Sequence, residues 1–189
     1  MKIINTRLDN CLIIEPKVFG DDRGFFLETF HLKRYSEQLN FNFEFVQDNH
    51  SFSWRAGTLR GLHFQSPENA QAKLVRCGTG AIFDVAVDIR KDSPKFGQWE
   101  GYELSAENGH QLYIPVGFAH GFVTLKPRSE IIYKCTGYYA PEAEGYIRWD
   151  DPSIGIEWPI VEKLIINKKD ADAPYFNDID SPFMFGENS

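Results

Sequence analysis

The stretch Phe83-Asp-Val-Ala-Val-Asp-Ile89 alternates apolar and small or acidic side chains along its whole length. Successive side chains of a β-strand point to opposite faces, so the four odd-numbered apolar residues share one face of such a strand. Asp84 and Asp88 lie on the other face, where carboxylates are usually solvated, although two aspartates could also hold a metal or a sugar. The pattern predicts a strand with one buried and one solvent-facing side.

Short runs of a similar kind recur on both sides of this stretch. They are separated by Gly, Pro, Asn and Asp, which interrupt strands and form turns. The strand-like runs are residues 11–15, 25–30, 43–46, 59–65, 73–77, 82–89, 99–104, 111–114, 121–125, 131–136 and 145–149. Many short strands at this spacing predict an antiparallel all-β sandwich or barrel. Residues 31–39 instead follow a helical pattern, with Leu32, Tyr35 and Leu39 on one face, and we expect this helix to cover the sheet.

Length and composition agree with one domain of this class. The chain has 189 residues, of which 15% are aromatic, and bulky aromatic side chains favour strands. We expect a single domain over residues 1–189, with a loosely held tail from about residue 178 to residue 189. The net charge of −7 provides no general basic field, so no nucleic-acid partner is expected. An anionic ligand would need a local cluster of Arg and Lys.

The cysteines and the N-terminus indicate the cellular compartment of the protein. Cys11, Cys77 and Cys135 form an odd set without metal-ligand spacing, which points to a reducing environment. The first residues lack the layout of a signal peptide, and no apolar run approaches the length of a membrane span. We therefore expect a soluble, cytoplasmic protein with no membrane partner.

The run Gly57-Thr-Leu-Arg-Gly-Leu-His-Phe-Gln65 carries the densest polar chemistry inside a predicted strand. In a regular pleat His63 and Arg60 point to opposite faces. They can serve one ligand only where the strand is irregular, and Gly61 would allow a bulge or a close backbone approach. The alternatives are a ligand site and a core histidine, hydrogen-bonded to a neighbour, beside a surface arginine.

A second histidine follows a turn in Pro115-Val-Gly-Phe-Ala-His-Gly121, where the next strand begins. This layout resembles the second motif of the cupin superfamily, whose members are double-stranded β-helix, or jelly-roll, barrels. Metal-binding cupins have in an earlier motif two histidines one residue apart and a glutamate, whereas this chain has His63-Phe-Gln65. Two imidazoles alone are a poor metal set. The resemblance predicts an all-β, cupin-like barrel with a few short helices and no metal.

A series of stretches, in order along nearly the whole chain, resembles the dTDP-4-dehydrorhamnose 3,5-epimerases. They are residues 19–26, 46–51, 59–65, 73–76, 83–90, 104–108, 114–123, 133–136 and 169–174. The resemblance implies an isomerase of dTDP-rhamnose biosynthesis that inverts C3 and C5 of a dTDP-4-dehydro-6-deoxy-D-glucose substrate without cofactor or metal. It also implies a homodimer with exchanged N-terminal strands, so that Arg23 and Glu28 reach the neighbouring site.

The same resemblance implies roles for individual residues. His63 is the expected base, and Asp170 would accept a hydrogen bond from its other ring nitrogen. Tyr133 is the expected acid on the opposite face of the sugar, and Lys73 the expected cation beside the enolate. A ketone at C4 acidifies C3 and C5 through one enolate oxygen, so one cation can serve both inversions. The residues expected to bind the diphosphate, nucleotide or sugar are Arg23, Glu28, Gln47, Asn49, Arg60, His120, Glu144 and Lys169.

Structural alternatives remain open for these residues. Asp170 also fits a helix start, three residues after Asn167 as the N-terminal cap. Tyr133 could be a packed core aromatic, and Lys73 an exposed strand lysine. For the whole chain, the alternatives are an epimerase that inverts only C3 or only C5, a non-catalytic sugar-nucleotide-binding cupin, and a metal-dependent cupin oxygenase.

Overall fold

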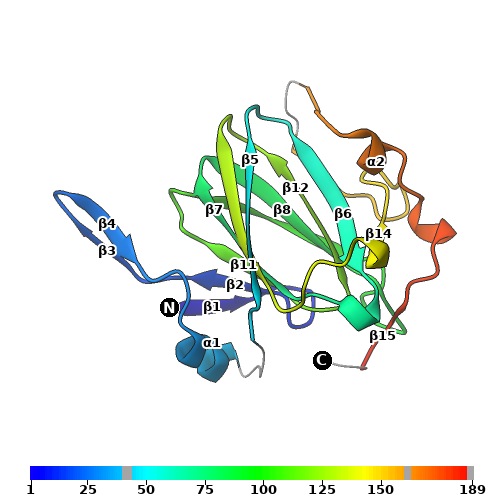
Figure 1. The fold of residues 1–189 in the computed structure, drawn as a ribbon, viewed down its shortest axis with the longest axis horizontal. Coiled ribbons are helices and arrows are strands. Elements are labelled where there is room, and N and C mark those ends of the chain that lie inside the picture. The colour runs from blue at the N-terminus through cyan, green and yellow to red at the C-terminus, as the bar shows by residue number, and fades with distance from the viewer. Residues whose placement is uncertain (40–43, 160–162, 187–189) are drawn as a thin grey trace.

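The computed structural model describes residues 1–39, 44–159 and 163–186, and most of its regular structure is β (Figure 1). The strands are β1 (Lys2–Asn5), β2 (Leu12–Glu15), β3 (Val18–Asp21), β4 (Gly24–Leu27), β5 (Gln47–Ser53), β6 (Leu59–Gln65), β7 (Lys73–Thr79), β8 (Ala81–Asp88), β9 (Arg90–Lys91), β10 (Trp99–Ser105), β11 (Gln111–Ile114), β12 (Phe118–Thr124), β13 (Ser129–Cys135), β14 (Glu144–Tyr146) and β15 (Phe183–Met184). The helices are α1 (Leu32–Leu39) and α2 (Lys168–Ala171), with short 3-10 turns at Pro67–Asn69, Pro141–Ala143 and Phe176–Asp178. Among these residues no helix is long and apolar enough to cross a membrane. The predicted all-β class with a few short helices is confirmed.

Two antiparallel sheets form the walls of the barrel. One has six strands in the order β1-β2-β11-β7-β13-β5, and the other has five in the order β10-β8-β12-β6-β14. Neighbouring strands are mostly distant in sequence, as in a jelly roll. The main core lies between the sheets and includes Val75 and Leu112 from the first sheet and Phe122 from the second. The predicted jelly-roll barrel is therefore present.

The prediction that one side of β8 faces solvent is wrong. This strand lies inside its sheet between β10 and β12, and Asp84 and Asp88 are both 0% exposed. The odd-numbered face packs against a second apolar cluster that includes Ile147, Phe176 and Phe183, all later in the chain. Later segments thus cover the outside of the sheet, and the aspartates occupy the barrel side.

The prediction of a loosely held tail is also wrong for the part from Ser181 to Phe185. β15 pairs with β9 in parallel, and the hydroxyl of Ser181 donates a hydrogen bond to the carbonyl of Ile89. The guanidinium of Arg90 lies 4.5 Å from the ring centroid of Phe118 and 5.0 Å from that of Phe185. The apolar residues inside the polar tail therefore anchor it to the barrel.

Each of the other expected runs overlaps a strand except the run at residues 43–46, although β4 already ends at Leu27 and β14 at Tyr146. Residues 44–46 are not in a strand, residue 43 lies outside the described residues, and β5 begins at Gln47. Polar side chains fill β5, so its sequence shows no apolar alternation, and continuous pairing with β13 defines it instead. The expected helix is α1, in which Tyr35 and Leu39 are buried and Leu32 is exposed.

The hairpin of β3 and β4 extends away from the barrel (Figure 1). In the described part of the chain it forms a sheet of its own. Its side chains Val18, Phe19, Phe25 and Phe26 are between 50% and 68% exposed. Exposed aromatic side chains in one small element are typical of an interaction surface.

Candidate active site

A pocket of about 290 Å³ opens where strands of the two sheets meet. The residues that line it are Gln47, Asn49, His63, Phe64, Gln65, Gln71, Lys73, Tyr133, Tyr139 and Glu144. β5, β7 and β13 belong to the six-stranded sheet, whereas β6 and β14 belong to the five-stranded sheet. The structure therefore brings together six expected site residues, namely Gln47, Asn49, His63, Lys73, Tyr133 and Glu144.

Asp170 lies behind this pocket and holds one nitrogen of the His63 ring. Its Oδ1 is 2.8 Å from Nε2 of His63, and its Oδ2 accepts the backbone N–H of Gly61 at 3.1 Å. The side chain of Asn167 accepts the backbone N–H of Asp170 at 2.7 Å, so the helix-start interpretation is also correct. The cap fixes the first turn of α2 and thereby presents the carboxylate to β6.

The environment of Asp170 keeps its carboxylate charged. Burial raises the pKa of Asp170, but the hydrogen bonds from His63 and Gly61 outweigh burial and hold it below its ordinary value. A charged carboxylate at Nε2 favours the tautomer that carries its proton there. The free nitrogen, Nδ1, is then the one able to accept a proton. The side chain of His63 is 32% exposed, so a ligand in the pocket can reach it.

Strand β6 is irregular near Gly61, which is the condition under which Arg60 and His63 can serve one ligand. His63 of β6 pairs with His120 of β12, and Arg60 of β6 pairs with Phe122 of β12. The register shifts between these two pairs. Residues paired directly across a sheet share a face, and His120 and Phe122 share one because they are two residues apart. Arg60 and His63 consequently point to the same side of β6. Arg60 is exposed and does not itself line the pocket.

Lys73 and Tyr133 enter the pocket from the sheet opposite His63. Burial lowers the pKa of Lys73, and the negative charges of nearby groups offset this only in part. Burial also raises the pKa of Tyr133, while the charge of Arg60 opposes the rise. Tyr133 therefore stays protonated at neutral pH, as a proton donor must, and Lys73 can donate a hydrogen bond to a developing negative charge.

His120, an expected sugar contact, is buried in the barrel. Its Nε2 lies 2.8 Å from Oδ1 of Asp84, and burial lowers its pKa. The other oxygen of Asp84 has no hydrogen-bond partner among the described residues. His120 lines a small hollow next to the main pocket, with Lys73 and Gln65. Its contact with a sugar stays a prediction.

Gln65 occupies the place of the second histidine of metal-binding cupins. Its side chain donates to the carbonyls of Asn69 and Tyr138 and accepts the N–H of Ala140 at 2.8 Å. It therefore ties two loops beside the pocket to β6. Within the described chain, no three His, Cys, Asp or Glu side chains are placed to hold a metal ion.

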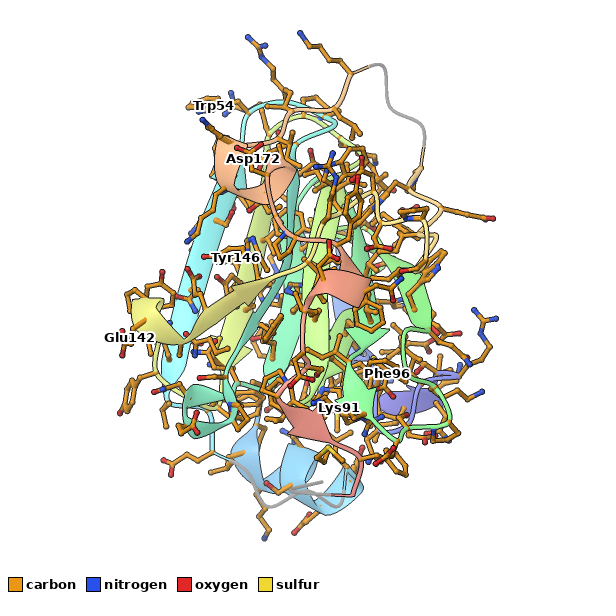
Figure 2. All side chains as sticks on the ribbon, turned by 90° about the vertical axis from the view of Figure 1, so that its right-hand side faces the viewer. Trp54, Lys91, Phe96, Glu142, Tyr146 and Asp172 are labelled. Atoms are coloured by element: carbon orange, nitrogen blue, oxygen red, sulfur yellow. The ribbon has the colours of Figure 1, made fainter. Side chains whose placement is uncertain are left out.

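Lys169 and Glu144, both expected ligand contacts, form an ion pair at 2.9 Å. Tyr146 donates a hydrogen bond to the same carboxylate, and its ring lies against that of His63. Figure 2 shows Tyr146 below α2, whose C-terminal end Asp172 marks. Tyr146 could not be found from the sequence, because its contact with His63 depends on the pairing of β14 with β6.

The remaining expected residues lie outside the pocket. Arg23 is at the turn of the β3–β4 hairpin and forms an ion pair with Asp21 at 2.5 Å. Glu28 follows the hairpin and pairs with Arg34 of α1. The structure does not bring either residue to the His63 pocket of the same chain.

The jelly-roll barrel places this protein in the cupin class, and its pocket combines a histidine–aspartate pair with a tyrosine and a lysine, groups that acid–base catalysis uses. The family model described as dTDP-4-dehydrorhamnose 3,5-epimerase matches residues 5–178. This chain belongs to the dTDP-4-dehydrorhamnose 3,5-epimerase family, and it is an isomerase.

Three relatives illustrate the match. A dTDP-4-dehydrorhamnose 3,5-epimerase from Salmonella typhimurium is 58% identical over 92% of this chain and 94% of its own length. A dTDP-6-deoxy-D-glucose-3,5-epimerase from Legionella pneumophila, solved with dTDP-4-keto-L-rhamnose, has a TM-score of 0.92 and 53% identity, covering 95% of this chain and 94% of that chain. A 3'-monoepimerase from Streptomyces bikiniensis, solved with dTDP-quinovose, has a TM-score of 0.85 and 32% identity, covering 91% of this chain and 86% of that chain.

Proposed function

We propose that this chain converts dTDP-4-dehydro-6-deoxy-D-glucose into dTDP-4-dehydro-L-rhamnose by inverting C3 and C5. The observation that carries the proposal is the placement of His63 and Tyr133 in one pocket on opposite sheets. Inversion requires removal of a proton from one face of the sugar and its return to the other face. A base and an acid on opposite walls meet this requirement.

The chemistry also needs a cation. A hydrogen beside the C4 ketone is on the order of a dozen pK units less acidic than an imidazolium, which corresponds to about 16 kcal/mol. One base cannot offset so large a difference. Lys73 lines the same pocket and can donate a hydrogen bond to the enolate oxygen that forms at C4. Because C3 and C5 flank the same carbonyl, one lysine can serve both inversions.

Each inversion is then a pair of proton transfers. Nδ1 of His63 takes the proton from the carbon, and the electron pair of the broken C–H bond moves to the C4 oxygen as an enolate. Asp170 supports the imidazolium that forms, through its hydrogen bond at Nε2. The hydroxyl of Tyr133 returns a proton to the opposite face and the enolate collapses to the ketone. The phenolate then regains a proton and His63 loses one to solvent.

Binding of the dTDP group is assigned to polar residues around the pocket. Arg60 and Lys169 would contact the diphosphate, since cations pair with phosphate oxygens. Gln47, Asn49, Glu144 and His120 would contact the nucleotide or the sugar. Arg23 and Glu28 would act from the hairpin of a second copy in a homodimer with exchanged N-terminal strands, which the exposed aromatics of that hairpin support. The three buried free cysteines suit the proposed cytoplasmic location.

Incubation with dTDP-4-dehydro-6-deoxy-D-glucose in heavy water tests the function. We expect deuterium at both C3 and C5 and the L-rhamno configuration in the product. NMR of the sugar protons detects both. Exchange and inversion at only one carbon would assign a monoepimerase instead. Binding without exchange at either carbon would contradict an enzymatic role. His63→Ala protein purified in the same way controls for contaminating activity.

A further inference from the structure

We propose that Tyr146 is a positioning residue that holds the His63 imidazole in the orientation needed for proton removal. This inference rests on the proposed role of His63 as the base. Nothing in the sequence motifs singles out Tyr146. It lies between the resembling stretches 133–136 and 169–174, and it does not line the pocket. The case comes from the pairing of strands and from the contacts of its ring and hydroxyl.

Tyr146 and His63 are direct partners across strands β14 and β6. Their ring centroids are 5.1 Å apart and the planes meet at 76°, an edge-on contact. The hydrogen bond to Asp170 fixes only one atom of the imidazole, Nε2. Because the second torsion of a histidine side chain is broad, one fixed atom leaves the ring free to tilt. The ring of Tyr146 restrains that tilt by packing.

The ring of Tyr146 is itself anchored. Its hydroxyl donates a hydrogen bond to Glu144, two residues earlier on the same strand, and Lys169 donates to the same carboxylate at 2.9 Å. Nζ of Lys169 also lies 4.2 Å from the centroid of the Tyr146 ring. Burial raises the pKa of Glu144, but its bonds to Tyr146 and Lys169 outweigh burial and lower it, so the carboxylate is charged.

These contacts connect the two groups that hold the imidazole. Lys169 is the neighbour of Asp170 on α2, so the helix that holds Nε2 of His63 is also bonded, through Glu144, to the tyrosine that packs on the ring. The ion pair between α2 and β14 thus connects the two groups that restrain the imidazole, Asp170 and Tyr146. Nδ1 then has a single direction, which proton abstraction requires.

Two substitutions separate the ring from the hydroxyl. Tyr146→Leu removes the aromatic edge, and we expect kcat to fall by about 10- to 100-fold, the cost of a small misplacement of a catalytic group, with KM little changed. Tyr146→Phe keeps the ring and loses only the bonds of the hydroxyl to Glu144 and Lys169, so it should retain most of the activity.

A second measurement does not need turnover. In protein with nitrogen-15 histidine, NMR distinguishes a protonated from an unprotonated ring nitrogen, and His63 can be assigned among the five histidines by comparison with His63→Gln. We expect the proton on Nε2 in both the native protein and Tyr146→Leu, because Asp170 sets the tautomer, and we expect the relaxation of the His63 ring signals to show larger ring motion only in Tyr146→Leu. If the native chain failed to epimerise its substrate, this spectrum would still decide the role of Tyr146.

Tyr102 provides the matched control. It donates to Glu100, two residues earlier on β10, in the same way that Tyr146 donates to Glu144. Tyr102→Leu should leave both kcat per folded molecule and the His63 signals unchanged. The proposal is overturned if Tyr146→Leu keeps the native kcat and the native motion of the His63 ring, or if Tyr146→Phe loses as much activity as Tyr146→Leu.

Discussion

Asp170 is a buried carboxylate whose contacts lower its pKa below the ordinary value of 3.8. A group with a lowered pKa in the folded state stabilises the fold above its unfolded pKa, and this stabilisation is lost as the pH falls through the folded pKa. We therefore expect Asp170→Asn to melt at a lower temperature than the native chain at neutral pH. The difference should shrink as the pH falls below 3.8. Calorimetry over a pH series measures it, and a constant difference would contradict the assignment.

Lys73 differs from Asp170, because burial opposes its charge and lowers its pKa. Lys73→Met keeps the length of the side chain but removes the hydrogen-bond donor, so the enolate loses its stabilisation. We expect kcat to fall on the order of 10²- to 10³-fold, as for an oxyanion-hole donor. Lys134→Met is the control, because Lys134 is paired with Asp48 on the same sheet. A native kcat in Lys73→Met would assign the enolate role to another group.

The residue types of the site could be predicted from the sequence, but several of their contacts could not. His63 and Asp170 are 107 residues apart, and only the resemblance joined them. Asp84 was interpreted as solvated because an isolated strand pattern does not reveal what covers its polar face. Tyr146 was missed for a related reason, since its partner is set by the pairing of β14 with β6.

At the scale of elements, Gly61 determines how close β6 and β12 can come. A Cβ atom at this position would lie 2.5 Å from Cα of Gly121, and the backbone of Gly61 has φ of +114°. Gly61→Ala must therefore push the two strands apart and move His63, which follows two residues later. Because the native conformation is incompatible with alanine, the loss of stability should exceed about 1 kcal/mol, and kcat should fall as well.

Gly155→Ala is the matched control for that substitution. Gly155 also has a positive φ, of +67°, but its added Cβ would meet only the carbonyl of Pro152 at an ordinary 3.8 Å. Urea unfolding and steady-state kinetics of both variants separate backbone strain from steric displacement. Equal effects of the two substitutions on kcat would mean that the close approach at Gly61 does not position the site.

The prediction of elements succeeded where apolar alternation is strong and failed where pairing alone defines the structure. β6 and β11 have the predicted bounds, because Leu59, Leu62 and Phe64 mark the first and three consecutive apolar residues mark the second. β5 is polar and was placed too early, since a hydrogen-bonded partner rather than its composition makes it a strand. The tail was predicted to be loosely held because most of its residues are polar, although Phe183 and its apolar neighbours anchor it.

At the scale of the whole molecule, the β3–β4 hairpin carries Arg23 away from the pocket that it is proposed to complete. If hairpins exchange, each site combines Arg23 of one copy with His63 of the other. Arg23→Ala and His63→Ala proteins, unfolded together and refolded, should then give mixed dimers with one intact site. With random pairing, about a quarter of the native sites would be restored.

Activity after mixing, measured at a substrate concentration where Arg23→Ala is poorly active, tests this exchange. Each variant refolded alone is the control. No recovery above the sum of the separate variants would contradict a shared site, and a monomeric mass with full activity would contradict the dimer itself. The fold class could be predicted from the spacing of short strands, whereas the projecting hairpin could not, because its role depends on a second copy.

The assignment of base and acid is tested most directly by comparing hydrogen exchange with inversion in two variants. In heavy water, His63→Ala should lose deuterium uptake at C3 and C5 together with inversion, by at least roughly 10²- to 10⁴-fold, because no proton leaves. Tyr133→Phe should still exchange, but faster than it inverts, since the proton returns from the face it left. If Tyr133→Phe lost exchange and inversion in step while His63→Ala still exchanged, the two roles would be reversed.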